Sequence, residues 1–334
     1  MDYTFTNFVV GSSNQFAHAA ALAVAQAPAT AYNPLLIHGK TGVGKTHLLQ
    51  AITQYIQQQH PAWRTVYLSA EHFMREWLRA LHHGRSETFQ AHYRHVDVLL
   101  VDDMQFMVGR ERTQEAFLYT FDALYEARKQ IILASNQPPQ DLAPLAARLR
   151  SRLTAGLLAD VQPPDMETRL AILTCKAVER GLVLPQDVAV LVASRLRANG
   201  SELEQGLTRI ATYASLHAQP IDITLAELVL QQIGAEHAAA LTTPRIQHAV
   251  VQHFGLKMSE LRSKKRQHAL AFPRQVAMFL CRELTAASLA EIGRQFGGRD
   301  HTTVLHSCAK IARLEEADEG VAGLLWQLRR VLGQ

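Results

Sequence analysis

The 334-residue sequence contains only three cysteines and lacks a hydrophobic run that could cross a membrane. Cys175, Cys281 and Cys308 are too widely spaced to form a metal-binding motif or a disulfide framework. No apolar stretch reaches the roughly 18–20 residues that a membrane-spanning helix needs, and no basic and then apolar leader stands at the N-terminus. We therefore expect a cytoplasmic protein without structural disulfides.

Charged residues are also few, at 19%, and they are unevenly distributed along the chain. Residues 1–243 carry 20 Lys or Arg against 22 Asp or Glu, residues 244–313 carry 12 against 4, and residues 314–334 carry 2 against 4. The +8 balance of residues 244–313 predicts a separate module that binds a polyanion, and a merely well-solvated basic surface is the simpler alternative. The 48% of hydrophobic residues excludes a disordered chain, and the length of 334 residues predicts two or three globular domains.

Short apolar runs alternate with helical patterns over residues 1–160. The runs lie at 35–38, 65–68, 98–101 and 130–134, and the helical patterns between them include 45–58, 71–82 and 112–127. This alternation predicts an α/β domain built on a parallel sheet. After Pro163-Pro164 only helical patterns follow, which predicts an all-helical segment over 161–238 and an all-helical domain over 239–334.

The segment after the first apolar run fits the phosphate-binding pattern G-x-x-x-x-G-K-[ST]. Its residues are Gly39, Lys40, Thr41, Gly42, Val43, Gly44, Lys45 and Thr46. The glycines let backbone N–H groups surround phosphate oxygens at the N-terminus of the helix that follows. We expect Lys45 to reach the terminal phosphates of a nucleotide and Thr46 to ligate Mg²⁺.

Two later strands deliver polar residues to the same edge of the predicted sheet. Asp102 and Asp103 follow the run at 98–101, in the position of Walker-B carboxylates, and Asn136 follows the run at 130–134. We expect Asp102 to hold the metal, Asp103 to polarise the attacking water, and Asn136 to lie near the γ-phosphate.

Three arginines, Arg148, Arg150 and Arg152, form a cluster after Leu145. On its own such a cluster is more typical of a solvated helix face. If subunits stack head-to-tail, one of these arginines could enter the neighbouring nucleotide site as an arginine finger.

The basic block contains the pattern of a helix-turn-helix. A helical pattern over 288–296 is followed by Gly297-Gly298 and by a second helical pattern over 301–313. In this motif the first residues of the second helix meet base edges in the major groove, and here they are Asp300, His301, Thr302 and Thr303. The basic run at 264–266 is expected to contact phosphates or the minor groove. A helical hairpin that binds protein is the alternative.

The order of these features resembles the DnaA family of bacterial chromosomal replication initiators, ATPases of the AAA+ class, over nearly the full length. The similar segments are 3–9, 32–35, 39–49, 97–106, 131–133 and 148–152. The most specific is Phe296-Gly297-Gly298-Arg299-Asp300-His301-Thr302-Thr303-Val304, which resembles the DNA-box signature of that family. The resemblance implies an AAA+ domain over 1–160, a helical lid over 161–238 and a helix-turn-helix DNA-binding domain over 239–334.

The resemblance also implies cofactors, partners and residue roles. The cofactors are ATP and Mg²⁺, and the activity is a slow ATPase in which hydrolysis acts as a switch. The implied partners are double-stranded origin boxes, single-stranded DNA, further copies of the chain in a head-to-tail oligomer with ATP, and acidic membrane lipids. Besides the phosphate loop, the implied nucleotide contacts are Val9, Val10, Asn14 and His47. Arg152 resembles the arginine finger and Arg148 the neighbouring subunit-contact arginine.

Two sets of DNA contacts follow from the same resemblance. The segment 71–81 resembles the helical insertion of initiators, and the residues implied to contact single-stranded DNA are Leu78, Arg79 and Arg112. The residues implied to contact double-stranded DNA are Lys264, Lys265, Arg266, Arg274, Gln275, Arg282, Arg299, Asp300, His301, Thr302 and Thr303.

Three departures from the family pattern bear on function. The sequence begins at the ATPase domain, so we expect helicase recruitment, a role of the family's N-terminal module, to need another surface or protein. Ser201 stands where the family carries an arginine that contacts the γ-phosphate, so we expect nucleotide binding with slow or altered hydrolysis. Phe272 replaces a basic residue before Pro273, which is a milder loss.

Two functions fit these residues. An initiator would assemble with ATP on origin boxes and open the duplex. A regulatory paralogue would bind the same boxes and control replication or transcription, with weak or no hydrolysis. An enhancer-binding transcription activator is disfavoured, because the sequence lacks the Gly-Ala-Phe-Thr-Gly-Ala loop of that class.

Overall fold

The chain forms two compact units, Met1–Gln231 and Gln232–Gln334. The computed structural model describes residues 3–142, 145–239, 241–263, 268–285 and 287–332. The units divide within helix α10 (Ile223–Ala239), and the boundary predicted after residue 238 lies at the end of the same helix. None of the described helices is long and apolar enough to span a bilayer.

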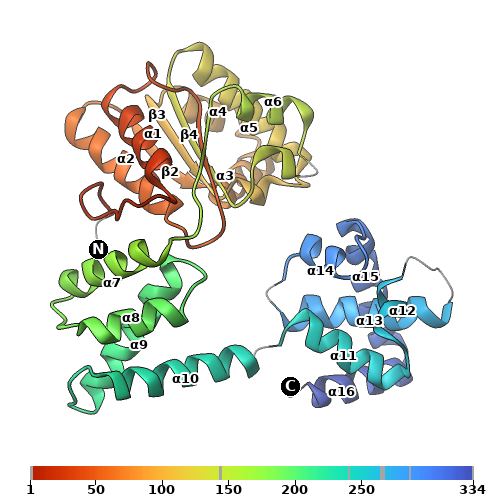
Figure 1. Cartoon of the computed structure of the whole chain (residues 1–334). Coiled ribbons are helices and arrows are strands. Elements are labelled where there is room, and N and C mark those ends of the chain that lie inside the picture. Colours follow the sequence, from red (N-terminus) through yellow and green to blue (C-terminus); the bar gives the residue numbers. More distant parts are fainter. Residues whose placement is uncertain (1–2, 143–144, 240, 264–267, 286, 333–334) are drawn as a thin grey trace. The chain divides into compact units, whose positions relative to one another are not determined.

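A parallel five-stranded sheet forms the centre of the first unit (Figure 1). Its strands are β1 (Leu35–His38), β2 (Thr65–Ser69), β3 (Val98–Asp102), β4 (Gln130–Ser135) and β5 (Leu157–Asp160), in the order β2-β3-β4-β1-β5. Every residue of β3 and β4 is buried, which explains why these strands are nearly continuous apolar runs rather than alternating patterns. The predicted α/β fold with a parallel sheet is confirmed.

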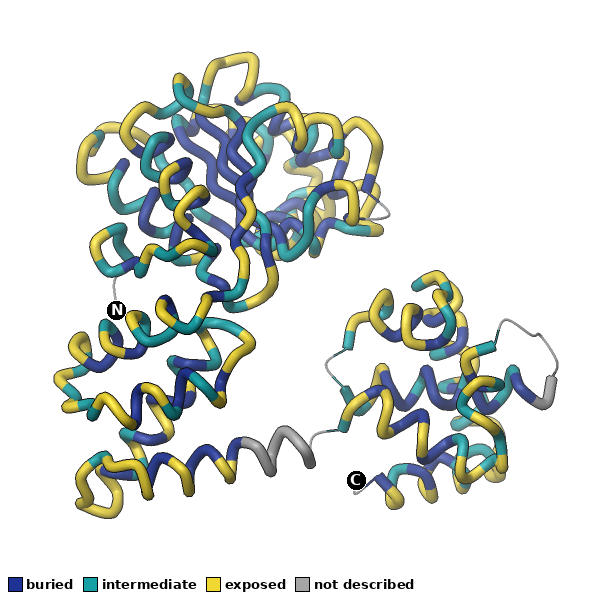
Figure 2. Tube along the Cα trace, in the orientation of Figure 1, coloured by how far each residue is buried: buried dark blue, intermediate teal, exposed yellow. Residues whose placement is uncertain are grey.

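Successive strand residues pack into two different cores, one on each face of the sheet. Leu36, Leu99 and Ile131 pack on the face covered by α3 (Ala70–His82), α5 (Glu111–Glu126) and α6 (Ala147–Thr154). Leu35, Leu100 and Ile132 pack on the face covered by α1 (Gln15–Gln26) and α2 (Lys45–Gln59). Figure 2 shows the buried strands between these helices. Because the strands are parallel, the residues that follow β1, β3 and β4 lie at one edge of the sheet.

Helical insertions and the lid complete the first unit. α3 forms a hairpin with α4 (Ser86–Arg94), and short helices η1 (Met104–Met107) and η2 (Pro139–Asp141) follow β3 and β4. The lid begins with α7 (Met166–Glu179), α8 (Gln186–Arg195) and α9 (Gly200–Leu216) and continues into α10. The Asp165 carboxylate caps α7 and the Asn199 amide oxygen caps α9, so both helices begin at a side-chain cap.

The described part of the second unit is entirely helical, as predicted. Its helices are α11 (Thr243–Phe254), α12 (Met258–Arg262), α13 (His268–Leu284), α14 (Leu289–Gln295), α15 (His301–Ala317) and α16 (Glu319–Val331). Ile292, Phe296, Val304 and Ile311 have no exposed surface and pack α14 and α15 into one core with α13 and α16. This core fixes the angle between the two helices of the predicted helix-turn-helix.

Candidate nucleotide-binding and DNA-binding sites

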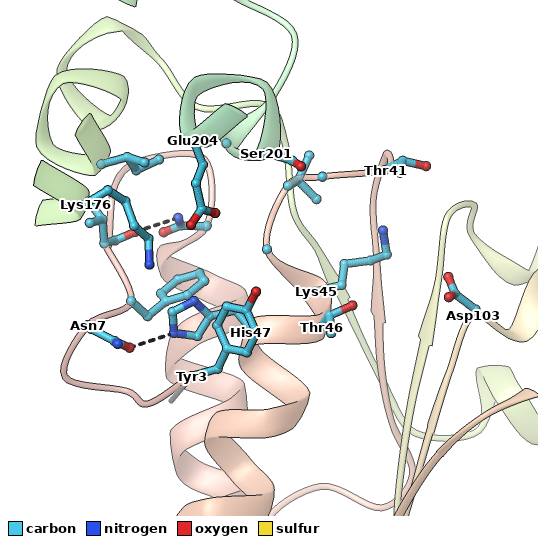
Figure 3. A pocket seen from close by; sticks show the side chains of 18 residues that line it. Tyr3, Asn7, Thr41, Lys45, Thr46, His47, Asp103, Lys176, Ser201 and Glu204 are labelled. Carbon is cyan, nitrogen blue, oxygen red and sulfur yellow. Dashed lines mark hydrogen bonds between the residues drawn. The ribbon is translucent and has the colours of Figure 1, made fainter. Parts of the chain in front are cut away.

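A cavity of about 400 Å³ opens between the phosphate loop and the lid (Figure 3). The loop requires glycine at Gly42, where φ is 79° and a Cβ atom would lie 2.7 Å from the Asn199 side chain. The backbone N–H of Ser201, in the first turn of α9, donates to the Gly42 carbonyl at 3.3 Å. The N-terminus of a lid helix therefore contacts the loop that is expected to hold phosphate.

Lys45 lies inside the loop and is only 7% exposed. Its Nζ donates to the carbonyl oxygens of Gly39 at 2.8 Å and Lys40 at 2.9 Å. Burial lowers the pKa of the Lys45 ammonium, and the negative charges of Asp102 and Asp103 oppose that change. A phosphate group offers a full negative charge in place of the two carbonyl dipoles, so the arrangement is suited to binding an anion.

Thr46 and Asp102 meet at the end of β3. The Thr46 hydroxyl donates to Asp102 Oδ2 at 2.7 Å, and the Tyr67 hydroxyl donates to the same oxygen at 3.2 Å. Burial and the charge of Asp102 raise the pKa of Tyr67 to about 12, so this phenol stays a donor at neutral pH. A hydroxyl beside a carboxylate is an oxygen donor set that suits Mg²⁺ when phosphate oxygens complete the coordination.

Gln105 in η1 joins Asp103 to Asn136. The Gln105 side-chain amide donates to Asp103 Oδ1 at 2.7 Å and accepts from the Asn136 backbone N–H at 3.1 Å. Asp103 adopts left-handed backbone angles, with φ 58° and ψ 46°, which are uncommon for a residue other than glycine. Among the described residues Asn136 Oδ1 is buried without a partner, as expected of a polar atom that faces a site for ligand or water.

Aromatic and charged side chains line the other end of the cavity, away from Lys45 (Figure 3). His47 packs against the rings of Tyr3 and Phe8, and its Nε2 lies 2.8 Å from the Thr4 carbonyl. Burial lowers the pKa of His47, so the neutral imidazole donates this hydrogen bond. Lys176 and Glu204 enter from the lid. This end of the cavity therefore combines aromatic rings with one positive and one negative side chain.

The second unit presents the start of α15 as an exposed surface. Thr302 and Thr303 are exposed, and His301 is partly exposed beside Asp300. Asp300 caps α15 by accepting from the Thr302 backbone N–H at 2.8 Å and from its hydroxyl at 2.7 Å. Both hydrogen bonds lower the pKa of Asp300, and the one from the Thr302 hydroxyl contributes more than the one from the backbone. The carboxylate is therefore charged and ordered at the position expected to meet base edges.

The turn before α15 is held against α12. At Gly297 φ is 86°, and a Cβ atom would lie 2.1 Å from the Arg262 carbonyl oxygen. Arg299 Nη2 donates to the Ser263 carbonyl at 2.7 Å. The start of α15 and the residue before the basic run at 264–266 are thus in direct contact. Lys264, Lys265 and Arg266 themselves lie outside the described residues.

Comparisons with known proteins match parts of both units. A model of the bacterial DnaA ATPase domain matches residues 1–160, and a model of the bacterial DnaA helix-turn-helix matches residues 243–311. The structure of AMPPCP-bound DnaA from Aquifex aeolicus is 32% identical over 98% of this chain and 98% of its own, with a TM-score of 0.62. The chain belongs to the DnaA family.

Two further DnaA structures extend this relationship. Domain III of DnaA from Thermotoga maritima is 38% identical over 69% of this chain and 96% of its own, with a TM-score of 0.67. A replication initiator DnaA bound to AMPPCP and single-stranded DNA is 32% identical over 99% of this chain and 98% of its own, with a TM-score of 0.62. A RuvB mutant from Thermotoga maritima is 13% identical with a TM-score of 0.56, which shows a shared fold alone.

Most of the nucleotide contacts predicted for this DnaA-family chain lie together. Those that line the cavity are Val9, Asn14, Thr41, Gly42, Val43, Gly44, Lys45, Thr46, His47 and Asp103. Gly39 and Asp102 contribute through Lys45 and Thr46, whereas Val10 is 49% exposed and outside the lining. The roles of all these residues in nucleotide binding stay predictions.

The arginines and the single-strand residues lie on other surfaces of this DnaA-family chain. Arg148 and Arg152 are exposed on α6, where both approach Asp122 of α5. Leu78 and Arg79 are exposed on α3, and Arg112 is exposed in the first turn of α5. All of these side chains are accessible, as contacts to DNA or to another subunit require.

Arg274 differs from the other predicted DNA contacts because it is only 4% exposed. Its guanidinium donates to the Leu261 carbonyl at 2.7 Å and the Glu260 carbonyl at 3.1 Å. This burial favours a role in positioning the chain between α12 and α13 over a direct contact. Arg282 is exposed on the same helix, and Gln275 is partly exposed with its Oε1 buried and unpartnered among the described residues.

Several residues of the nucleotide site were not predicted from the sequence. Gln105, Tyr67, Lys176 and Glu204 were given no role from the sequence. Gln105 lies in the segment 97–106 that resembles the family, two residues after Asp103, and Glu204 lies three residues after Ser201. The structure also shows the surroundings of the two substituted residues among the three departures from the DnaA pattern. Ser201 lines the cavity with a short hydroxyl side chain, and the Phe272 ring packs against Phe254 in the second unit.

Proposed function

We propose that the chain is a replication initiator that binds ATP with Mg²⁺ in the first unit and reads specific double-stranded DNA with α15. The observation that carries the proposal is the hydrogen bond between the Thr46 hydroxyl and the Asp102 carboxylate at the phosphate loop. The relatives bound to AMPPCP, one of them with single-stranded DNA, support ATP and single-stranded DNA as ligands.

ATP binding is expected to use residues that already face one another. Thr46 and Asp102 would hold Mg²⁺, which when bound supplies positive charge that neutralises phosphate oxygens. Lys45 would exchange the carbonyls of Gly39 and Lys40 for phosphate oxygens. The Ser201 backbone contact to Gly42 links the loop to the lid, so a change at the loop reaches α9 directly. ATP would thus act mainly as a switch.

Hydrolysis is expected to be slow. Asp103, fixed by Gln105, would polarise a water, and Asn136 would orient it near the γ-phosphate. The hydroxyl of Ser201 cannot supply the cationic contact that an arginine would make at this position. Loss of one charged hydrogen bond would weaken a step by about 1.5–3 kcal/mol, while binding through the loop would survive.

Assembly and DNA recognition use separate surfaces in this proposal. Arg152 would enter the nucleotide site of the next subunit in a head-to-tail filament, with Arg148 contacting the same neighbour. At the start of α15, Asp300 can accept from cytosine N4 and the threonine methyl groups can pack on thymine methyls. Single-stranded DNA would then follow the surface of Leu78, Arg79 and Arg112 as the duplex opens.

A strand-opening assay tests the proposal. An AT-rich duplex flanked by candidate boxes is incubated with the protein and ATP or ADP, and unpaired thymines are detected by permanganate. Opening with ATP, and none with the Lys45→Ala variant, is the expected result. If the wild-type protein binds the boxes but opens no duplex, and Lys45→Ala binds the boxes equally well, the chain would instead be a regulatory protein.

The regulatory alternative is favoured by one observation, the serine at position 201. The Ser201→Arg substitution separates the two functions. In a slow initiator it should accelerate hydrolysis and sharpen the preference for ATP over ADP. In a regulator that does not use its nucleotide, the substitution should leave box occupancy the same with ATP and with ADP.

A further inference from the structure

The Asp122 carboxylate lies between the two exposed arginines of α6. Arg152 Nε donates to Asp122 Oδ1 at 2.7 Å, and Arg148 Nη2 lies 3.8 Å from Asp122 Oδ2. The Asp122 side chain is 24% exposed, whereas those of Arg152 and Arg148 are 45% and 80% exposed. The two arginines are four residues apart on one helix and therefore lie on the same face.

The hydrogen bond between Arg152 and Asp122 uses only one of the three guanidinium nitrogens. Asp122 accepts from Nε, the nitrogen nearest the backbone, rather than from the two terminal nitrogens. Among the residues that the structure describes, the Arg152 side chain has no other hydrogen-bond partner. The carboxylate thus fixes the guanidinium, while both terminal NH₂ groups remain available to an acceptor from outside the chain.

Packing and a hydrogen bond fix helices α5 and α6, which carry Asp122 and Arg152, relative to each other. Leu149 and Leu153 on the inner face of α6 are fully buried in the core that also holds Phe121 of α5. The Gln114 amide oxygen, also on α5, accepts from the Ala146 backbone N–H at 2.8 Å, just before α6 begins. Asp122 therefore projects from a helix whose position relative to α6 is set by packing.

We propose that Asp122 is a positioning residue for Arg152. It holds the Arg152 guanidinium toward a phosphate oxygen of the ATP that is bound to a neighbouring subunit. This inference rests on the proposed head-to-tail assembly with ATP. An arginine side chain loses conformational entropy when it is ordered, and the Asp122 hydrogen bond imposes that order before subunits meet. The opposite possibility is a brake, in which the negative charge of Asp122 competes with phosphate for Arg152.

Substitutions at Asp122 distinguish positioning from braking. Asp122→Ala removes the acceptor, and Asp122→Asn keeps an acceptor oxygen without the charge. Glu115→Ala, which removes an exposed carboxylate elsewhere on α5, is the control. The readouts are ATP affinity at concentrations where the chain is monomeric, the protein concentration at which ATP drives assembly, and ATP hydrolysis within the assembly. Thermal unfolding midpoints identify any variant that folds poorly.

The positioning role predicts a defect confined to the assembly. Asp122→Ala should raise the protein concentration needed for assembly about 5- to 20-fold, toward the value of Arg152→Ala, with monomer ATP affinity unchanged. Asp122→Asn should recover most of the loss and Glu115→Ala should resemble the wild type. Asp122→Ala combined with Arg152→Ala should be no worse than Arg152→Ala alone, since the two residues act as one unit.

Each contrary outcome has a distinct meaning. Stronger assembly of Asp122→Asn than of the wild type would show a brake and overturn the inference. Normal assembly of Asp122→Ala beside a defective Arg152→Ala would overturn the inference and leave the proposed arginine finger standing. Normal assembly of Arg152→Ala itself would overturn the finger and the inference together.

Discussion

The Thr46 hydroxyl and the Asp102 carboxylate are joined by a 2.7 Å hydrogen bond across 56 residues of sequence. Thr46 lies in the first turn of α2, the helix after β1, and Asp102 ends β3, so only the parallel sheet brings them together. The fold therefore holds side by side the two oxygens that Mg²⁺ would need. Little reorganisation is required, which favours tight binding of a metal–nucleotide complex.

Thr46→Val is expected to remove the metal-dependent part of ATP binding. Valine has nearly the shape of threonine but no oxygen, so the Asp102 carboxylate loses a donor and the metal loses a ligand. The loss should be about 1.5–3 kcal/mol, or roughly 10- to 150-fold in ATP affinity with Mg²⁺. Titration calorimetry with Mg²⁺ and with EDTA measures it.

The control for this substitution is Thr53→Val on the same helix. The Thr53 hydroxyl donates to the Leu49 carbonyl within α2 and does not line the cavity. ATP affinity with Mg²⁺ should stay within about twofold of the wild type, the scale of a substitution that touches no ligand. An equal loss in both variants would indicate damage to α2 rather than to a metal site.

Gln105→Leu should slow hydrolysis while leaving ATP affinity nearly unchanged. Without the amide, Asp103 loses a donor and the Asn136 backbone N–H loses an acceptor, and neither group belongs to the phosphate loop. We expect a decrease of about 10- to 100-fold in single-turnover hydrolysis, the range of a misplaced catalytic group. Gln57→Leu, an exposed glutamine on α2, is the control. A large fall in ATP affinity in Gln105→Leu would contradict this division of roles.

The sheet and the phosphate loop could be predicted because both depend on short stretches of sequence. β1, β2, β3 and β4 begin at the predicted residues. β1, β3 and β4 are mainly buried and therefore mainly apolar, and β2, although partly exposed, is rich in β-branched and aromatic residues. β5 was not predicted because only Ala159 of its four residues is buried and the strand ends at the exposed Asp160, so it resembles a loop. The α4 helix was not predicted either, because it buries only Phe89 and Tyr93 and has no long apolar face.

The supporting residues of the sites could not be predicted, because they act through contacts between distant segments. Gln105 matters only because β3 and β4 are neighbours, which places Asn136 beside η1. Asp122 matters only because α5 and α6 pack together. Arg274 looked like a DNA contact because an arginine in a basic block usually lies at the surface, whereas the fold buries it against backbone carbonyls.

The lid should lose stability in acid through Asp165. Its carboxylate accepts from the Thr168 backbone N–H at 2.8 Å and from the Ser12 hydroxyl at 2.7 Å, and the former contact contributes most to lowering its pKa from 3.8 to about 2. Because the folded state favours the charged form, this contribution is present above pH 3.8 and is lost as the pH falls toward 2. Hydrogen exchange of α7 in the wild type and in Asp165→Ala should differ at pH 5 and converge at lower pH. A difference that grows in acid would reverse the assigned sign.

Arg274→Met and Arg282→Met should separate stability from DNA binding within α13. Methionine at 274 would leave the Leu261 and Glu260 carbonyls without their donor, at a cost of about 1–3 kcal/mol each when buried. Arg282 is exposed, so Arg282→Met should change the unfolding free energy by less than about 0.5 kcal/mol. If Arg282 contacts phosphate, its loss should weaken binding to all duplexes alike. Urea unfolding followed by circular dichroism, together with box binding, measures both effects.

His301→Ala tests the placement of α15 in the major groove, with His306→Ala as a matched control on the same helix. His301 lies in the first turn beside Asp300, whereas His306 is exposed more than a turn later. If the first turn reads base edges, His301→Ala should weaken box binding by about 1–3 kcal/mol and leave binding to random duplex unchanged. His306→Ala should retain the full preference for boxes. Lys264→Ala should weaken box and random duplex equally and reduce the salt dependence of binding. Equal losses on both duplexes for His301→Ala would place His301 at the phosphate backbone and require a different recognition surface.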